Sequence, residues 1–351
     1  MKNKYLFIAR KAKNDEFQTL ISDIEKELEN YNLKGKSVYC PCDDYRKSQF
    51  VKYLKDNYER LGLTGLCSTN YNNGDGAYKY VYDGRNTFIT ELNGDGDFQS
   101  EECSKIRDEY DVIITNPPFS LGSEFFRWVA GKKFLILANT NVITLKDVFP
   151  MVKDGNMWCG CTNYNVGMYF IIPDNYKKFT CIDENGNKLG RVSSTCWWTN
   201  LDNDRTYNAL VLSKTYNPND YLTYDDIDAI EVSKVKNIPV DYDGVMGVPI
   251  TFMGKYNPNQ FEIVGMGSFK VRGKKTYKRI LIRRKQQETK AEQAMEKIQD
   301  KKKAFHVHQL IVLHADNGVD TSRPKHTVIE PFYDLSIVYD EINGGLKIRA
   351  A

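Results

Sequence analysis

The sequence of 351 residues lacks the features that would place it in a membrane or a secretory pathway. It has no apolar run near about 18 residues, so we expect no membrane-spanning helix. The apolar stretch at residues 5–9 ends at Arg10 and is too short for a secretory signal. Eight cysteines without an export signal predict reduced thiols and a cytoplasmic location.

A large net charge and a metal-binding motif are also missing. The 49 Lys and Arg residues nearly balance 46 Asp and Glu residues, which leaves a formal charge of +3. The pairs Cys40-x-Cys42, Cys159-x-Cys161 and His306-x-His308 are separated by one residue, whereas structural zinc sites use about two to four. We therefore expect no metal, and the spacing supports no Ser-His-Asp or Cys-His arrangement.

The positive charge that is present is concentrated in one segment. Residues 270–303 hold 14 Lys and Arg and four acidic residues, a charge of +10, so the remainder of the chain carries 3 − 10 = −7. Such a basic segment fits a polyphosphate partner, to which it binds with release of counterions. Residues 270–285 contain no acid and favour nucleic acid, whereas residues 286–303 are equally compatible with a projecting, solvated helix.

Short apolar stretches alternate with amphipathic ones in the first part of the chain. This alternation predicts an α/β fold with a mainly parallel sheet and helices on both faces. We expect helices over residues 14–31, up to about residue 60, and from 120 or 123 to 129, a hairpin over residues 78–92, and strands at 37–41, 66–69, 112–115 and 134–138.

The composition of the sequence changes in its second part. Residues 167–173, 196–199 and 209–213 resemble strands, some of which would complete the first sheet. From about residue 200 the sequence is polar and rich in turn residues. We therefore divide the chain into residues 1–200 and a mixed α+β region, residues 201–351.

The strongest chemical signal is Asn116-Pro117-Pro118-Phe119, which follows the strand predicted at 112–115. Ligands bind at the carboxyl ends of strands in open parallel sheets. The prolines fix the backbone and remove two N–H donors, so carbonyl groups are left to face the site. The Asn116 oxygen accepts hydrogen bonds, and the Phe119 ring offers a face for a flat heterocycle. A rigid turn without chemistry is the alternative.

These groups suit methylation of an exocyclic ring amine. Such a nitrogen is a weak nucleophile because its lone pair is delocalised into the ring. Two oxygen acceptors that bind both of its hydrogens draw the nitrogen toward tetrahedral geometry and stabilise the positive charge that develops. Alignment with a methyl donor supplies the rest of the rate increase.

Two loops upstream could hold the methyl donor. The strand at 37–41 runs into Pro41-Cys42-Asp43-Asp44, where Asp43 or Asp44 would bind the ammonium group of S-adenosylmethionine. In the second loop, Asp97 would accept from the adenine amine of the donor and Phe98 would cover its ring. Each stretch could instead be an ordinary turn.

Several stretches resemble the EcoRI-methylase-like family of adenine-specific DNA methyltransferases over about residues 5–285. The resemblance rests on residues 13–19, Gly96-Asp97-Phe98, Asn116–Phe119, residues 198–202, Gly244-Val245-Met246-Gly247-Val248-Pro249-Ile250-Thr251-Phe252 and Tyr277–Arg284. It implies a Rossmann-like domain, S-adenosylmethionine as donor with S-adenosylhomocysteine as product, and a flipped adenine in duplex DNA as acceptor. It further implies a bacterial, archaeal or phage-encoded enzyme, with a cognate restriction enzyme as an open question.

The resemblance also implies roles for single residues. Phe17 and Thr19 would touch the methionine end of the donor, Pro41 and Asp43 would form the first cofactor loop, and Asp97 and Phe98 would contact the donor's adenine. Asn116 would contact both donor and target base, and Pro117, Pro118 and Phe119 would complete the catalytic loop. Residues 201–351 would recognise the target. Our candidates for contact with phosphates are Lys274, Lys275, Arg279, Arg283 and Arg284.

Three departures from the family pattern keep alternatives open. The first cofactor loop lacks glycines, no acid follows the second strand (Asn70 is the nearest polar residue), and Cys159-Gly160-Cys161 stands where apolar or aromatic residues are expected. The acceptor could instead be RNA or a protein glutamine. A non-catalytic protein that binds nucleic acid on a methyltransferase scaffold is the third hypothesis.

Overall fold

The computed structural model describes residues 17–72, 76–174, 176, 179–203 and 208–285, and the backbone of residues 335–340 and 345–350. Contacts divide the chain into two units, residues 1–287 and 288–351. The described part of the second unit is a hairpin of β17 (Leu335–Asp340) and β18 (Gly345–Ala350). The helix expected over residues 286–303 and the two histidines at 306 and 308 lie outside the described residues.

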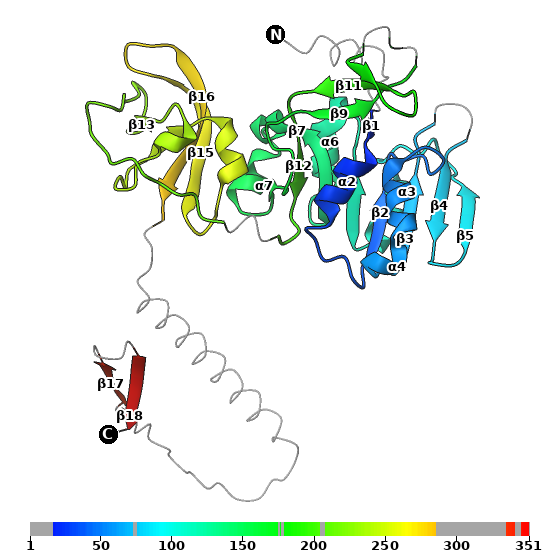
Figure 1. The fold of residues 1–351 in the computed structure, drawn as a ribbon, viewed down its shortest axis with the longest axis horizontal. Helices are drawn as coiled ribbons and strands as arrows, with labels where there is room; N and C mark the ends of the chain where they lie inside the picture. Colours follow the sequence, from blue (N-terminus) through cyan, green and yellow to red (C-terminus); the bar gives the residue numbers. More distant parts are fainter. Residues whose placement is uncertain are drawn as a thin grey trace, which may run out of the picture. The chain divides into compact units, whose positions relative to one another are not determined.

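An eight-stranded mixed sheet forms the centre of the first unit, in the order β5-β4-β3-β2-β6-β7-β12-β8 (Figure 1). Its strands are β2 (Ser37–Cys40), β3 (Gly65–Thr69), β4 (Tyr78–Tyr82), β5 (Thr87–Glu91), β6 (Val112–Thr115), β7 (Lys133–Asn139), β8 (Trp158–Cys159) and β12 (Thr195–Thr199). The strands and the hairpin predicted in the first part of the chain are confirmed. However, only the central strands β3, β2, β6 and β7 run parallel to one another. The outer strands β4, β5, β12 and β8 are antiparallel to their neighbours, so the expectation of a mainly parallel sheet holds only for the centre of the sheet.

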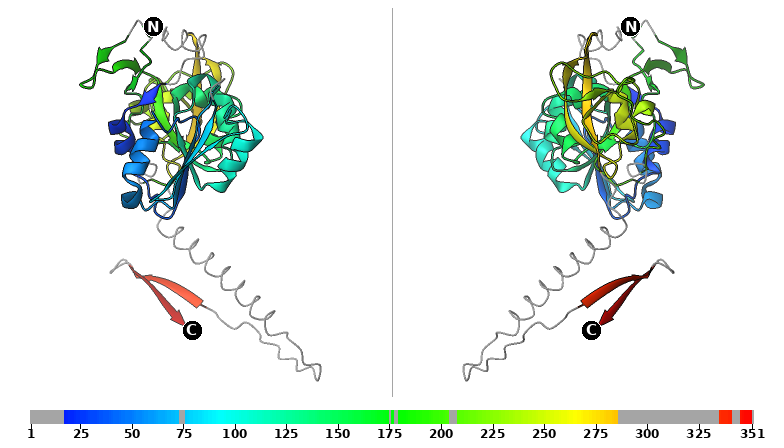
Figure 2. Two further views of the ribbon diagram at one scale, coloured as in Figure 1. Left: turned by 90° about the vertical axis from the view of Figure 1, so that its right-hand side faces the viewer. Right: turned by 90° about the vertical axis from the view of Figure 1, so that its left-hand side faces the viewer.

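Helices cover both faces of this sheet, which buries the central strands on both sides. Val38 and Ile114 point into a core with α2, α3 and α4, whereas Tyr39 and Ile113 point into a core with α5, α6 and α7. Figure 2 shows these two sets of helices on opposite sides of the sheet. The helices are α2 (Ile21–Leu28), α3 (Gln49–Asp56), α4 (Tyr58–Leu61), α5 (Glu101–Glu109), α6 (Gly122–Trp128) and α7 (Phe149–Lys153), with 3-10 turns η1 (Phe119–Leu121) and η2 (Thr140–Thr144).

The first helix is shorter than its apolar spacing predicts. It begins at Ile21, and Gln18–Thr19 form the strand β1. β1 pairs with β9 (Met168–Ile171), which continues through β11 (Lys188–Val192) to β10 (Cys181–Ile182) in a small antiparallel sheet. Of the later predicted strands, 196–199 completes the large sheet as β12, while 167–173 belongs to this separate one.

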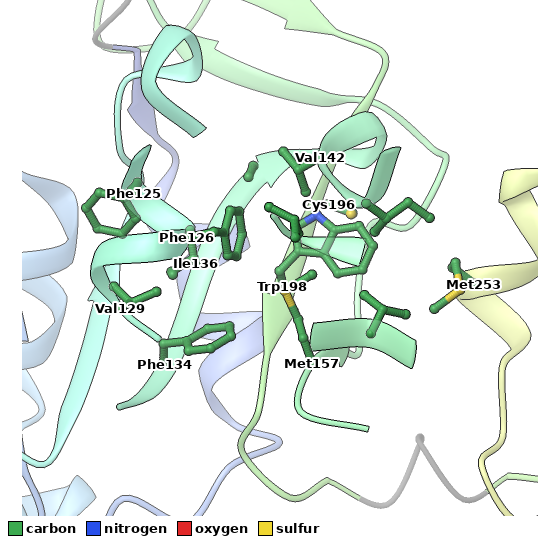
Figure 3. Close-up of a cluster of buried hydrophobic side chains, with 14 of the residues drawn as sticks. Phe125, Phe126, Val129, Phe134, Ile136, Val142, Met157, Cys196, Trp198 and Met253 are labelled. Atoms are coloured by element: carbon green, nitrogen blue, oxygen red, sulfur yellow. The ribbon is translucent and has the colours of Figure 1, made fainter. Parts of the chain in front are cut away.

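A third sheet has the order β13-β14-β16-β15, and a 3-10 helix η4 (Val235–Asn237) lies between β13 and β14 in the sequence. It consists of β13 (Ile230–Glu231), β14 (Met246–Val248), β15 (Phe261–Lys270) and β16 (Thr276–Arg284), and a second 3-10 helix η5 (Ile250–Lys255) follows β14. The strand predicted at 209–213 is not formed. Met253 of η5 reaches the core around Trp198 of β12, so this sheet and the large sheet share one apolar cluster (Figure 3).

Candidate active site

A cleft of about 710 Å³ opens where the parallel strands end. Segments that follow β2, β3 and β6 contribute to its walls, as expected for the carboxyl edge of an α/β sheet. The opposite wall comes from β1 and from the residues after β9. Of the residues predicted to bind donor or base, the cleft brings together Phe17, Thr19, Asp43 and Asn116.

Asn116 presents an unsatisfied acceptor at this cleft. Its side-chain Nδ2 donates a hydrogen bond of 2.6 Å to the carbonyl oxygen of Phe17, which fixes the orientation of the amide. Its Oδ1 is buried and has no hydrogen-bond partner among the described residues. A buried acceptor without a partner is costly, typically about 1–3 kcal/mol, and in a native site it indicates a ligand or another functional partner.

Thr115 connects the Asn116–Phe119 loop to the loop that follows β2. Its hydroxyl lies 2.5 Å from the carbonyl oxygen of Pro41 and 2.7 Å from Oδ2 of Asp43. The other oxygen of Asp43 accepts from the hydroxyl of Ser48 at 2.6 Å, and Ser48 in turn caps the start of α3. The Asp43 carboxylate is therefore held from two sides by hydroxyl groups.

Cys42 takes the backbone conformation that a glycine would normally provide. Its φ is +64°, in the left-handed region that residues with a Cβ rarely adopt. Strain of this kind costs about 1–3 kcal/mol and is found where a loop is shaped for a ligand. The loop that follows β2 thus makes a glycine-like turn although its sequence contains no glycine.

Phe119 is placed differently from the expectation. Its ring is 8% exposed and makes edge-to-face contacts with Phe17 at 6.2 Å and Phe170 at 5.9 Å between ring centroids. Pro117 beside it is also buried, and Pro118 is partly exposed. In this structure the ring does not present an open face to the cleft, and the aromatic cluster instead supports the loop that carries Asn116.

Asp97 and Phe98 do not line the cleft. Phe98 is 4% exposed and packs against Phe125 and Trp128, with ring centroids 5.0 and 5.5 Å away. One Asp97 oxygen accepts from the backbone N–H of Gln99. The loop nevertheless abuts the cleft, because a Cβ on Gly96 would collide with the carbonyl group of Asn70, which lines it.

Several cleft residues were not singled out from the sequence. Arg46 binds both oxygens of Asp44, which holds the pKa of that carboxyl below its usual value although partial burial raises it. Asn70, by contrast, is the polar residue that the sequence offered after the second strand; its side chain accepts from the backbone N–H of Tyr78 and is buried. The remaining wall, which distant segments supply through the pairing of β1 with β9, includes Ile171, Ile172, Pro173, Asp174, Asn187 and Lys188. No local sequence signal marks these residues.

A buried carboxylate supports the loop after β8. Glu27 of α2 accepts hydrogen bonds from the backbone N–H groups of Cys161 and Thr162, and from the hydroxyls of Thr162 and Tyr31. Burial raises the pKa of Glu27, and these hydrogen bonds oppose the rise. A Cβ on Gly160 would collide with this carboxylate, which gives the unexpected Cys-Gly-Cys stretch a structural reason.

The predicted phosphate contacts lie on the hairpin of β15 and β16 and differ in accessibility. Lys274 and Lys275 are exposed in its turn and have no ion-pair partner among the described residues. Arg283 is exposed and lies 3.7 Å from Glu262, while Arg284 donates to the carbonyl oxygen of Val240.

Arg279 is the least accessible of the five predicted phosphate contacts. Its side chain is 11% exposed, and its guanidinium forms a close ion pair with Glu231, whose carboxylate also accepts from the hydroxyl of Tyr224. Arg279 is therefore positioned as part of the framework of the hairpin and not on its surface.

The comparison with protein families decides the kind of protein. The model of the family described as "Adenine-specific methyltransferase EcoRI" matches residues 5–314. The chain belongs to this family. The resemblance noted in the sequence is thereby confirmed, and the chain is a site-specific DNA methyltransferase that acts on adenine.

Curated relatives agree with membership of the EcoRI methyltransferase family. Type II methyltransferase M.EcoRI of Escherichia coli is 40% identical over 316 residues, which cover 81% of this chain and 97% of that protein. Type II methyltransferase M.MgeORF184P of Mycoplasma genitalium is 36% identical, covering 73% of this chain and 84% of the relative. M.MpnI of Mycoplasma pneumoniae is 35% identical, with 74% and 85% covered. No solved structure matches.

No helix in the described part of this EcoRI-family chain is long and apolar enough to span a bilayer. Within the same residues, no group of three or more His, Cys, Asp or Glu side chains is arranged to hold a metal ion.

Proposed function

We propose that the cleft at the ends of β2, β3 and β6 is where S-adenosylmethionine and an extruded adenine of duplex DNA meet, and that the methyl group is transferred to the exocyclic N6 amine. The observation that carries this proposal is the Oδ1 of Asn116, a buried acceptor without a partner among the described residues, at a cleft within the usual size range of ligand sites.

The chemistry of the cleft fits S-adenosylmethionine, which when bound supplies an activated methyl group. Asp43 lines the cleft at the turn that the left-handed Cys42 makes, and Pro41, whose carbonyl oxygen accepts from Thr115, precedes this turn. The hydroxyl of Thr19 is buried without a partner in the described chain and lies on the facing wall. We propose that Phe17, Thr19, Pro41 and Asp43 hold the methionine end of the donor.

Asn116 and its loop perform the step on the base. The Oδ1 of Asn116 and a backbone carbonyl of the Pro117-Pro118 segment accept the two hydrogens of the amine, so the nitrogen lone pair is turned toward the methyl donor. The same oxygens stabilise the positive charge that appears as the new bond forms. The amine then loses one proton to solvent, which needs no strong base in the site.

Extrusion of the adenine costs a few kcal/mol, which protein contacts must offset. Phe119 can contact the base only through the small part of its ring that is exposed. We therefore propose that its contacts with Phe17 and Phe170 mainly hold the loop that positions Asn116. Asp97 and Phe98 remain our proposed neighbours of the donor's adenine, because their loop adjoins Asn70 at the cleft wall.

The large sheet supports a Rossmann-like methyltransferase domain, and we propose that residues 1–200 form it. We propose that residues 201–351 recognise the target, with Lys274, Lys275, Arg283 and Arg284 as phosphate contacts and Arg279 as a residue that supports them. The names of the relatives suggest a restriction-modification role, in which a cognate restriction enzyme would be the partner.

Asn116→Ala tests the proposal. Removal of the acceptor should lower transfer of labelled methyl groups from S-adenosylmethionine to mixed-sequence DNA by at least roughly 10²- to 10³-fold. Calorimetric binding of the donor should change much less. Asn141→Ala, at an exposed asparagine of η2, is the matched control and should behave as wild type.

The outcomes separate the competing functions. An active Asn116→Ala enzyme would remove the mechanism. A wild-type protein that binds no S-adenosylmethionine would indicate a non-catalytic scaffold, and methylation of RNA or a protein glutamine in place of DNA would change the acceptor.

A further inference from the structure

The hairpin of β15 and β16 has two chemically different faces near its turn. Directly opposed residues of an antiparallel pair lie on the same face, and successive residues alternate. Phe269 is opposite Tyr277, and Gly267 is opposite Arg279. Ser268 is opposite Lys278 on the other face.

The first face is covered by the rest of the chain. Phe269 and Tyr277 pack on Tyr224, and Arg279 is paired with Glu231 on the same side. The carbonyl group of Thr223 accepts from the backbone of Arg272, which ties the turn to this covering segment. This face is therefore not available to a partner.

The second face is exposed near the turn. Ile280 lies on it closer to the base of the hairpin and belongs to the core shared with the large sheet. Beyond Ile280, Ser268, Thr276 and Lys278 are exposed, and the ammonium group of Lys278 has no hydrogen-bond or ion-pair partner among the described residues. Figure 1 shows this hairpin as the longest pair of strands in the third sheet.

The charge of this segment matches a polyanion. Residues 268–278 contain five cations and no acid. Lys270 forms an ion pair with Asp225, with 3.3 Å between Nζ and Oδ2. The cations left to bind a polyanion are Lys278 on the open face and Arg272, Lys274 and Lys275 around the turn.

We infer that this open face lies in the major groove of the target duplex, with Lys278 and Ser268 reading base edges and Lys274 and Lys275 binding the flanking phosphates. A major groove about 12 Å wide admits a two-stranded ribbon. Because the opposite face is covered, only the open face can meet the bases. Lysine and serine side chains are suited to acceptors such as those of guanine, whereas lysines at a turn add affinity without sequence preference.

This inference rests on the proposed DNA substrate, and it is tested by binding as well as by methylation. Wild type, Lys278→Gln, Ser268→Ala and the double variant Lys274→Gln/Lys275→Gln are each used to select duplexes from a random pool. Lys34→Gln, at an exposed lysine before β2 on the amino side of the sheet, is the matched control.

Lys278→Gln should relax selection at one or two base positions by about tenfold to a hundredfold, and Ser268→Ala should relax a neighbouring position less. The double variant should select the same sequences but bind all of them more weakly, with a salt dependence of log K that is shallower by about 2.

Unchanged base preferences in both Lys278→Gln and Ser268→Ala would overturn the assignment of these residues. A double variant with the salt dependence of Lys34→Gln would overturn the role of the turn. If the wild-type protein selects specific duplexes but does not methylate them, that result would count against the proposed chemistry and leave this inference supported.

Discussion

A single hydroxyl group links the two loops that meet in the cleft. Thr115 contacts both Pro41 and Asp43, and the next residue is Asn116. A hydrogen bond to a charged group contributes about 1.5–3 kcal/mol, so this contact is large enough to determine the position of the loop that follows β2.

Thr115→Val should therefore raise the KM for S-adenosylmethionine about tenfold or more, with a smaller effect on kcat. The substitution keeps the shape of the side chain but removes the donor to Asp43. Thr115→Ser, which retains the hydroxyl, should restore most of the donor affinity. Steady-state kinetics with varied donor measures the split, and an equal loss in both variants would indicate a packing role instead.

The sequence could predict those site residues that belong to a local motif. Asn116 and Asp43 follow strands with clear apolar patterns, and the cleft brings them together. The sequence could not show that Phe119 packs against Phe170, or that Asp97 does not line the cleft, because both depend on packing between segments distant in the chain.

At the scale of secondary structure elements, α2 holds the loop after β8 through one buried carboxylate. The Glu27 carboxylate meets only donors among the described residues, namely two backbone N–H groups and two hydroxyls. A glutamine there would turn an N–H₂ group toward a donor, so Glu27→Gln should lower the free energy of unfolding by about 1–3 kcal/mol.

The pH dependence of this effect has a definite sign. Burial raises the pKa of Glu27 in the folded state above its ordinary value of 4.5. Between that value and the raised pKa, the folded state binds more protons than the unfolded state, so the free energy of unfolding falls as pH rises and levels off above the window. The difference between wild type and Glu27→Gln should therefore be largest near the acid end and shrink with rising pH.

Urea denaturation across this pH range measures the difference. Glu25→Gln, at an exposed position of the same helix, is the control and should show no such trend. A gap between wild type and Glu27→Gln that widens with pH would show that the hydrogen bonds outweigh burial.

The elements that the sequence missed have weak or misleading patterns. In α5 only Cys103 and Ile106 are buried, which gives little helical periodicity. Phe17 fits the apolar spacing of the following helix, but it precedes β1, whose pairing with β9 could not be seen locally. Residues 209–213 are apolar enough for a strand, yet Val211 is 89% exposed and no neighbouring strand pairs with the segment.

At the scale of the whole molecule, the shared apolar cluster makes the two main sheets interdependent. Met253 is 2% exposed and lies in the cluster that contains Trp198 (Figure 3). Met253→Ala should lower the free energy of unfolding by about 2–5 kcal/mol, because it leaves a cavity between the sheets. Lys255→Ala, at an exposed position of the same 3-10 helix, should change it by less than about 0.5 kcal/mol.

The unfolding of Met253→Ala should remain a single transition in which far- and near-ultraviolet circular dichroism coincide. Two separated transitions would show that the sheets are independent and that the division near residue 200 separates autonomous domains.

The outer strand β5 has a consequence for the behaviour of concentrated solutions. All five of its residues are exposed, including Phe88 and Ile89, and among the described strands only β4 pairs with it, along one side. An unpaired, apolar strand edge is a template for pairing with another molecule. We expect reversible self-association that increases with protein concentration, and a lysine at position 89 should suppress it in light-scattering measurements.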